Sequence, residues 1–222
     1  YHFALRSPTR RDLAHAVRRL VEHQHPIQGA SDHGVSEAIY VADPEGNGIE
    51  LYADRPRDAW PVAGGQIVMK TAPLDIREML ALASSTAAAE AAPAQTDIGH
   101  IHLHVAELGS AERFFREFLG FDVTFRGLSS ALFFSAGGYH HHVGINTWAG
   151  ANAASPECTG LIAYRFEVPI NDVLYCLRHR APLAGYEAHA RKLQSGAECL
   201  RIRDPNGSWL EMVGGVFAKS EV

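Results

Sequence analysis

Two histidines and one glutamate could form a metal site in this sequence. His2 is the second residue of an apolar, strand-like segment, and His100 occupies the same place in a similar segment later in the chain. Glu50 lies inside another apolar run, where burial of a carboxylate is costly unless something pairs with it. Two histidines and one carboxylate on rigid strands form the facial triad that suits non-heme Fe(II) and leaves positions open for O₂ and substrate. These residues therefore predict an iron site.

A turn motif occurs twice and places a glutamate at the same distance each time. Asp-Pro-Glu-Gly at 43–46 precedes Glu50, and Asp-Pro-Asn-Gly at 204–207 precedes Glu211, seven residues after the aspartate in both cases. Proline presets φ and glycine accepts positive φ, so each motif predicts a tight turn before a strand. The repetition indicates that the chain is built from similar units.

The order of expected elements repeats three times. Residues 1–56, 98–148 and 160–213 each indicate a strand, a helix and further strands, which is a βαβββ module. The second helix is expected over Ser110–Leu119 with Ser110 as its N-cap, and the third over Asp172–Arg180. The first helix is indicated by apolar residues on one face, at Leu13, Val17, Leu20 and Val21.

These modules define the expected domains. We expect modules at residues 1–59, 97–150 and 151–222, and a linker with a helix at residues 60–96. One curved four-stranded sheet cannot close its own concave face, so the first two modules should pair around the metal site. The chain starts inside a strand without methionine, so we expect an absent module before it as the partner of the third. The fold class is α+β, with modules pairing into open curved-sheet barrels.

Composition excludes several other classes. A chain of 222 residues with 46% hydrophobic and 20% charged residues is typical of a globular protein. A net charge of −5 indicates neither a nucleic-acid nor a membrane-surface partner, and no apolar stretch reaches the about 18 residues of a membrane span. Three cysteines without metal spacing fit reduced thiols, so we expect a cytoplasmic protein. A homo-oligomer is compatible with this composition.

The sequence resembles the vicinal oxygen chelate superfamily. Gly-His-Ile-His-Leu-His-Val at 99–105, followed by Ala-Glu-Arg-Phe-Phe-Arg-Glu-Phe-Leu-Gly-Phe at 111–121, carries that likeness. Tyr-His-Phe-Ala-Leu at 1–5, Asp-Pro-Glu-Gly-Asn-Gly-Ile-Glu-Leu-Tyr-Ala-Asp-Arg-Pro at 43–56 and Gly-Gly-Tyr-His-His-His-Val-Gly-Ile-Asn-Thr-Trp at 137–148 resemble its bacterial catechol 2,3-dioxygenase-like branch. That branch carries four modules, so this chain would hold modules two to four.

The resemblance implies an Fe(II)-dependent extradiol ring-cleaving dioxygenase that acts on catechol or a substituted catechol with O₂. The metal triad of the family falls on His2, His100 and Glu50. Its acid–base histidine falls on His142, with His140 as the alternative, because strand alternation would place residues 140 and 142 on one face and residue 141 on the other.

Other site residues also follow from the resemblance. The second active-site histidine of the family falls on His33, and the tyrosine ten residues before the glutamate ligand falls on Tyr40, which could hydrogen-bond a substrate oxygen. His102 shares a face with His100 and is expected, with His140, to line the substrate pocket.

The third module departs from this pattern. Ala163 stands where the other modules have histidine, so Glu211 has no histidine partner of its own and the site is expected to be degenerate. The second module has Asn146 near the place of a closing glutamate. One complete site, between the first and second modules, is the economical interpretation.

Two alternatives stay open. A glyoxalase- or isomerase-like enzyme of the same fold would use Mn²⁺, Ni²⁺ or Zn²⁺ without O₂, and would usually have more carboxylate ligands. A non-catalytic, small-molecule-binding resistance protein of the same fold would need no metal. Fold alone does not decide between these functions, and the set formed by His142, His33 and Tyr40 favours the dioxygenase.

Overall fold

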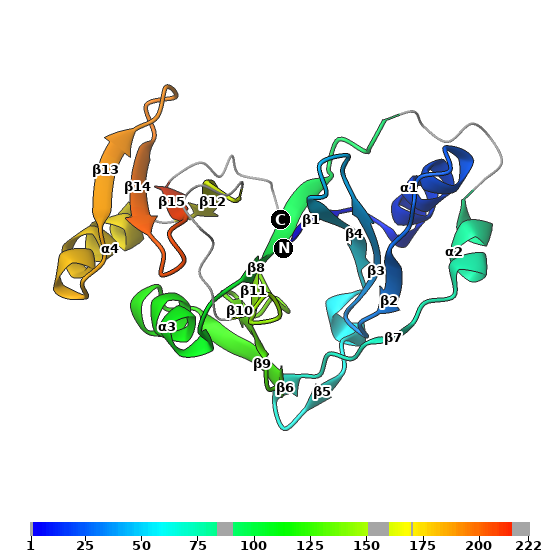
Figure 1. The fold of residues 1–222 in the computed structure, drawn as a ribbon, viewed down its shortest axis with the longest axis horizontal. Coiled ribbons are helices and arrows are strands. Elements are labelled where there is room, and N and C mark those ends of the chain that lie inside the picture. Colours follow the sequence, from blue (N-terminus) through cyan, green and yellow to red (C-terminus); the bar gives the residue numbers. More distant parts are fainter. Residues whose placement is uncertain (1, 84–90, 151–159, 170, 215–222) are drawn as a thin grey trace. The chain divides into compact units, whose positions relative to one another are not determined.

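The computed structural model describes residues 2–83, 91–150, 160–169 and 171–214 (Figure 1). Tyr1, Cys158 and part of the expected linker lie outside these residues. The chain divides into two units, the first made of Tyr1–His104 with Asp122–Asn146 and the second of Val105–Phe121 with Thr147–Val222. Within the described residues, no helix is long and apolar enough to cross a membrane.

The first unit is built on a nine-stranded sheet with the order β7-β2-β3-β4-β1-β8-β11-β10-β9. The strands are β1 (His2–Arg6), β2 (Gly29–Asp32), β3 (Ser36–Ala42), β4 (Gly48–Asp54), β7 (Ala72–Pro73), β8 (Asp97–His104), β9 (Asp122–Leu128), β10 (Ala131–Ser135) and β11 (Val143–Asn146). Because β1 and β8 pair antiparallel, strands of the first and second repeats join in one sheet. A short hairpin of β5 (Val62–Ala63) and β6 (Gln66–Ile67) and the 3₁₀ turn η1 (Arg57–Ala59) follow β4.

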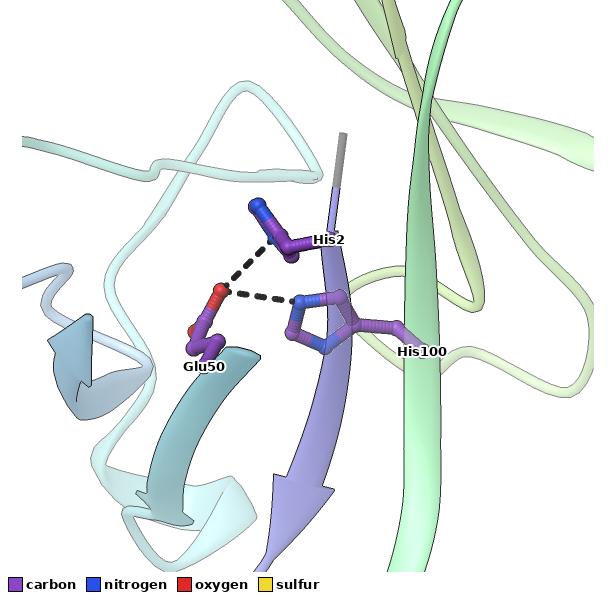
Figure 2. A group of neighbouring side chains, drawn as sticks. All are labelled: His2, Glu50 and His100. Atoms are coloured by element: carbon purple, nitrogen blue, oxygen red, sulfur yellow. Dashed lines mark hydrogen bonds and ion pairs between the residues drawn. The ribbon is translucent and has the colours of Figure 1, made fainter. Parts of the chain in front are cut away.

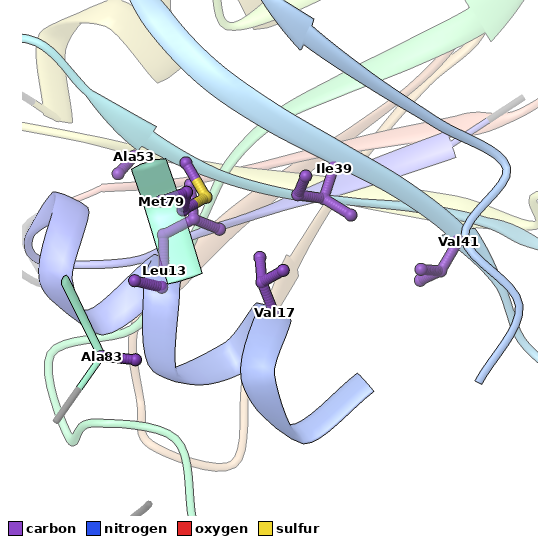
Figure 3. Close-up of a cluster of buried hydrophobic side chains, with 8 residues drawn as sticks. Leu13, Val17, Ile39, Val41, Ala53, Met79 and Ala83 are labelled. Carbon is purple, nitrogen blue, oxygen red and sulfur yellow. The ribbon is translucent and has the colours of Figure 1, made fainter. Parts of the chain in front are cut away.

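Two helices cover the outer side of this sheet beside β3 and β4. Helix α1 (Arg10–Glu22) begins after Thr9, whose hydroxyl accepts a hydrogen bond from the amide of Asp12, and α2 (Ile76–Leu82) is capped by Asp75. Figure 3 shows the buried apolar cluster that these helices form with the sheet. Its members include Leu13, Val17, Ile39, Val41, Ala53, Met79 and Ala83.

The second unit has a four-stranded sheet with the order β12-β15-β14-β13. The strands are β12 (Ala163–Val168), β13 (Ala188–Lys192), β14 (Glu198–Arg203) and β15 (Trp209–Gly214), and α4 (Asn171–Leu183) packs against three of them. The other helix of this unit starts as α3 (Leu108–Glu112) and continues as the π-helix η2 (Arg113–Phe118). Ser110 as N-cap was therefore wrong, since the helix begins at Leu108 with Glu107 in the capping position.

Candidate metal centre

The three expected metal ligands meet on adjacent strands at the centre of the first unit. His2 is on β1, Glu50 on β4 and His100 on β8, and Figure 2 shows their side chains directed toward one another. In the sheet register both Glu50 and His100 lie opposite Ala4, which is fully buried. The small side chain of Ala4 leaves the space in which the longer chains on either side meet.

Distances within this group are short. His2 Nε2 lies 3.0 Å from Glu50 Oε2, and His100 Nε2 lies 3.2 Å from the same oxygen. One ligand atom from each residue lies within 4.8 Å of the others. The side chains of Glu50 and His100 are only 5% and 2% exposed, so the carboxylate is withdrawn from water and depends on its two imidazole neighbours.

The charge state of the group suits a cation. Burial raises the pKa of Glu50, but His100 and His2 outweigh it through charge and hydrogen bonds and hold that pKa well below the ordinary value. Burial lowers the pKa of His2, against the opposing influence of Glu50. Nδ1 of His100 is buried without a hydrogen-bond partner among the described residues. Two imidazoles and one carboxylate are a donor set that fits a divalent transition metal such as Fe(II).

Gly99 leaves room for a tyrosine beside His100. A side chain at Gly99 would overlap the hydroxyl of Tyr52, so only glycine lets this tyrosine lie across the strand. The rings of Tyr52 and His100 have centroids 4.9 Å apart. Tyr52 therefore packs on a candidate ligand, a contact that the sequence pattern did not indicate.

His102 lies beside the three candidate metal ligands and is hydrogen-bonded to Asn146. Its ring centroid is 5.0 Å from that of His2, and its Nε2 accepts a hydrogen bond of 2.9 Å from Asn146 Nδ2. The carbonyl oxygen of the same asparagine lies 2.6 Å from His104 Nδ1. Asn146 therefore bridges two histidines of β8, and burial holds the pKa of His102 well below its ordinary value.

His33 and Tyr40 come together next to the metal ligands. His33 Nδ1 lies 2.9 Å from the carbonyl oxygen of Lys70, to which it must donate, so Nε2 accepts the 2.8 Å hydrogen bond from the Tyr40 hydroxyl. Tyr40 lies opposite Glu50 in the sheet, and its ring centroid is 5.8 Å from that of His2. A cavity of about 280 Å³ is lined by Tyr40 and His2, among other residues.

The three consecutive histidines do not lie in a strand. Strand β11 begins at Val143, so the expected alternation of residues 140–142 was wrong. The ring of His141 lies on that of His100, with centroids 4.1 Å apart. His142 instead accepts a hydrogen bond from the amide of Ala136 at 3.3 Å, and its Nδ1 lies 3.2 Å from the hydroxyl oxygen of Ser135. The structure thus brings His141, which the sequence argument set aside, next to the candidate ligands.

His140 points to a different partner. Its Nε2 lies 2.8 Å from Asp54 Oδ1, at the end of β4, and its Nδ1 lies 2.7 Å from His141 Nδ1. Its ring is fully buried. Asp54 was not among the candidate residues, and no local spacing could have indicated it, because it lies 86 residues from His140.

In the second unit, the carboxylate that corresponds to Glu50 is neutralised by arginines. Glu211 lies opposite Arg165 on β12, and the two side chains approach to 2.8 Å. Arg191 and Arg201 also contact this carboxylate, at 2.5 and 3.2 Å. Ala163 lies two residues before Arg165, at the place that His2 has relative to Ala4. Glu211 is thus an ion-paired carboxylate.

Comparison with known proteins places this architecture in a family. No family model matches the sequence. The curated catechol-2,3-dioxygenase of Bacillus subtilis (strain 168) is 43% identical over 219 residues, which cover 96% of this chain and 74% of that protein. A solved structure of a proposed dioxygenase from Bacillus subtilis superposes with a TM-score of 0.62 at 10% identity, covering 97% of this chain and 61% of that one. The chain belongs to the catechol 2,3-dioxygenase-like branch of the vicinal oxygen chelate superfamily.

Proposed function

We propose that the protein is an Fe(II)-dependent extradiol dioxygenase that opens the ring of catechol or a substituted catechol. The observation that carries this proposal is the buried group of His2, His100 and Glu50, whose ligand atoms lie within 4.8 Å of one another. Its donor set is the one that suits non-heme Fe(II) oxygenases. The curated relative named catechol-2,3-dioxygenase, at 43% identity, supports the same reaction class.

The ligand group determines what a bound metal could supply. His2, His100 and Glu50 would hold Fe²⁺, which when bound supplies positive charge that favours loss of the catechol protons and leaves positions for substrate and O₂. Glu50, as a carboxylate, supplies the single negative charge of the group. Mn²⁺, Ni²⁺ and Zn²⁺ accept the same kinds of donor atom, so metal identity is part of the test.

Tyr40 and His33 would hold the substrate. The Tyr40 hydroxyl is near His2 and is oriented by His33, whose own tautomer is fixed by the Lys70 carbonyl. A hydroxyl with a fixed acceptor behind it can accept a hydrogen bond from a catechol hydroxyl or pass its proton toward His33 Nε2. These two residues would therefore orient one substrate oxygen and receive its proton.

Among the three consecutive histidines, His141 would be the acid–base group. Its ring lies between His100 and Phe133, with centroids 4.1 and 4.9 Å away. His142 is held by Ser135 and Ala136 at the end of β10. A general acid or base must reach the substrate, and the ring that contacts a candidate ligand is the one best placed to do so.

The test is an oxygen-uptake assay on protein purified without air and loaded with Fe(II). We expect one O₂ consumed per catechol and a ring-opened product that carries an aldehyde, which distinguishes cleavage beside the two hydroxyl carbons from cleavage between them. Glu50→Gln and His100→Ala should lose both metal and uptake. The matched control is His189→Ala, which removes a histidine whose side chain is 62% exposed. Stoichiometric Fe(II) binding without uptake of O₂ on any catechol would contradict the proposed reaction.

A further inference from the structure

We propose that Asp54 and His140 are positioning residues that hold His141 in a single tautomer and orientation beside the metal ligands. This inference rests on the proposed function for its consequence in catalysis, but the arrangement itself can be tested without any activity. Neither residue belongs to the metal triad, and Asp54 lies on the same strand as Glu50, four residues later.

The three residues form a continuous hydrogen-bonded line. Asp54 Oδ1 lies 2.8 Å from His140 Nε2, and His140 Nδ1 lies 2.7 Å from His141 Nδ1. The line ends where the ring of His141 lies on that of His100. The residues His140 and His141 are 0% and 8% exposed, whereas the side chain of Asp54 is 22% exposed. The line thus runs from the partly exposed Asp54 carboxylate to the buried candidate metal ligands.

The order of donors along the line follows from the carboxylate. An ionised Asp54 can only accept, so His140 Nε2 must carry a proton. In neutral His140 the other nitrogen, Nδ1, then has only a lone pair. Two nitrogens 2.7 Å apart need one proton between them, so His141 Nδ1 must donate. This leaves Nε2 of His141 as the unprotonated nitrogen, which is the state required of a group that takes a proton from a substrate hydroxyl.

Other contacts keep Asp54 and His140 in place. The Tyr139 hydroxyl donates to the Asp54 carboxylate, with distances of 2.9 and 3.1 Å to its two oxygens, and the Arg6 guanidinium lies 3.6 Å from it. The ring of Trp60 packs on His140 with centroids 5.3 Å apart. These contacts leave the carboxylate little freedom to turn away from His140. Substituting a residue that orients a metal-ligating histidine costs on the order of 10–100-fold in activity or metal affinity, and we expect a loss of similar size for a residue that orients His141.

The first experiment is nitrogen NMR of the histidine rings in the metal-free protein. We expect His141 to carry its proton on Nδ1 in the wild type and to populate both tautomers in Asp54→Asn, because an amide can present its NH₂ group to His140. Asp97→Asn removes another carboxylate that pairs with Arg6, leaves the Asp54–His140 contact in place and should keep the Nδ1–H tautomer. A wild-type His141 protonated on Nε2, or a tautomer unchanged by Asp54→Asn, would overturn the inference.

The second measurement is kinetic and uses the Fe(II)-loaded protein. Asp54→Asn should lower kcat by about 10–100-fold with little change in KM and with full metal content, and Asp54→Glu should restore part of the rate. Asp97→Asn is the matched control, because Asp97 also pairs with Arg6 but does not contact His140. An unchanged kcat in Asp54→Asn would overturn the positioning role. Absence of activity in the wild type would contradict the proposed function, while the tautomer measurement would still decide this inference.

Discussion

The residue opposite each strand carboxylate distinguishes the repeat that carries the candidate metal site from the third repeat, which carries Glu211. Opposite Glu50 lies Ala4, whose methyl group leaves space for a second ligand from the next strand. Opposite Glu211 lies Arg165, which fills that space and supplies a positive charge. A metal ion and a guanidinium compete for the same carboxylate oxygens. The arginine therefore removes the site more completely than loss of the histidine at Ala163 alone would do.

Gly144 gives the corresponding position in the second repeat. Gly144 lies opposite His102 in the sheet, and this register makes Gly144 the counterpart of Glu50. The sequence pattern placed that counterpart near Asn146, two residues later. A Cβ at Gly144 would lie 3.0 Å from His102 ring atoms. We expect Gly144→Ala to lower the free energy of unfolding by about 1–3 kcal/mol, because this buried ring has little room to move. Urea denaturation would measure the change.

The control for this substitution is Gly160→Ala. No atom lies within 4 Å of the added Cβ at that position, so its free energy of unfolding should stay within about 0.5 kcal/mol of the wild type. Equal destabilisation by the two substitutions would show that the contact with His102 does not determine the cost.

A second prediction at the residue scale separates the neighbouring histidines His141 and His142. Because the ring of His141 contacts that of His100, His141→Ala should lower kcat by about 10²–10⁴-fold while Fe(II) content is retained. His142→Ala should lower kcat by less than about tenfold, since its ring bonds to Ser135 and Ala136. Steady-state kinetics on Fe(II)-loaded variants measure both. The reverse order would assign the acid–base role to His142, the residue on which the family resemblance places it.

At the scale of elements, local sequence patterns predicted the strands that carry the ligands. Apolar alternation and the Asp-Pro turn placed Glu50 in a strand, and that strand is β4. The same alternation failed for residues 140–142, because hydrogen bonds from outside the local sequence hold this segment. The hydroxyl of Thr124 donates to the His140 carbonyl, and the His142 amide donates to the Phe134 carbonyl. Long-range contacts of this kind leave no periodic signal in the sequence.

A buried carboxylate fastens α1 to the sheet, and this too was not predicted from sequence. The side chain of Glu37 on β3 is 4% exposed and lies 2.6 Å from Arg10 on α1 and 2.7 Å from Arg55 after β4. We expect Glu37→Gln to lower the free energy of unfolding by about 1–3 kcal/mol, because a neutral amide satisfies the two guanidinium groups poorly. Chemical denaturation would measure this loss.

The matched substitution on the same helix contact is Glu78→Gln. The side chain of Glu78 also pairs with Arg10 but is 62% exposed, so its loss should cost less than about 0.5 kcal/mol. Comparable effects from Glu37→Gln and Glu78→Gln would argue against burial as the source of the stabilisation.

At the scale of the whole molecule, the candidate site belongs to one of the two units. The ligands, His33, Tyr40 and the three consecutive histidines all lie within Tyr1–His104 and Asp122–Asn146. The first unit is therefore the part of the protein in which histidine protonation can affect stability most strongly. Its buried polar residues include His100, His102, His140 and His141.

The pKa of these buried imidazoles determines the sign of the pH effect. Burial lowers the pKa of His142 to about 4, and it also lowers the pKa of His140 and His141. An unfolded chain takes up these protons near pH 6.5, whereas the folded chain does not until the pH is much lower. The unfolded state therefore binds more protons in this interval, and stability falls as the pH falls from about 6.5 toward about 4.

We therefore expect the metal-free protein to lose about 2 kcal/mol of unfolding free energy between about pH 7.5 and about pH 5 from His142 alone, and His140 and His141 to add to this loss. Urea denaturation at several pH values measures the change. His142→Asn cannot be protonated and should make this dependence shallower, while the exposed-site control His189→Asn should leave it unchanged. The lowered pKa of Glu50 adds a further loss below about pH 4.5, because there the unfolded chain takes up a proton that the folded chain does not. A urea midpoint that stays constant over the same interval would mean that these three imidazoles already carry protons in the folded state. The neutral tautomers assigned to His140 and His141 would then be wrong.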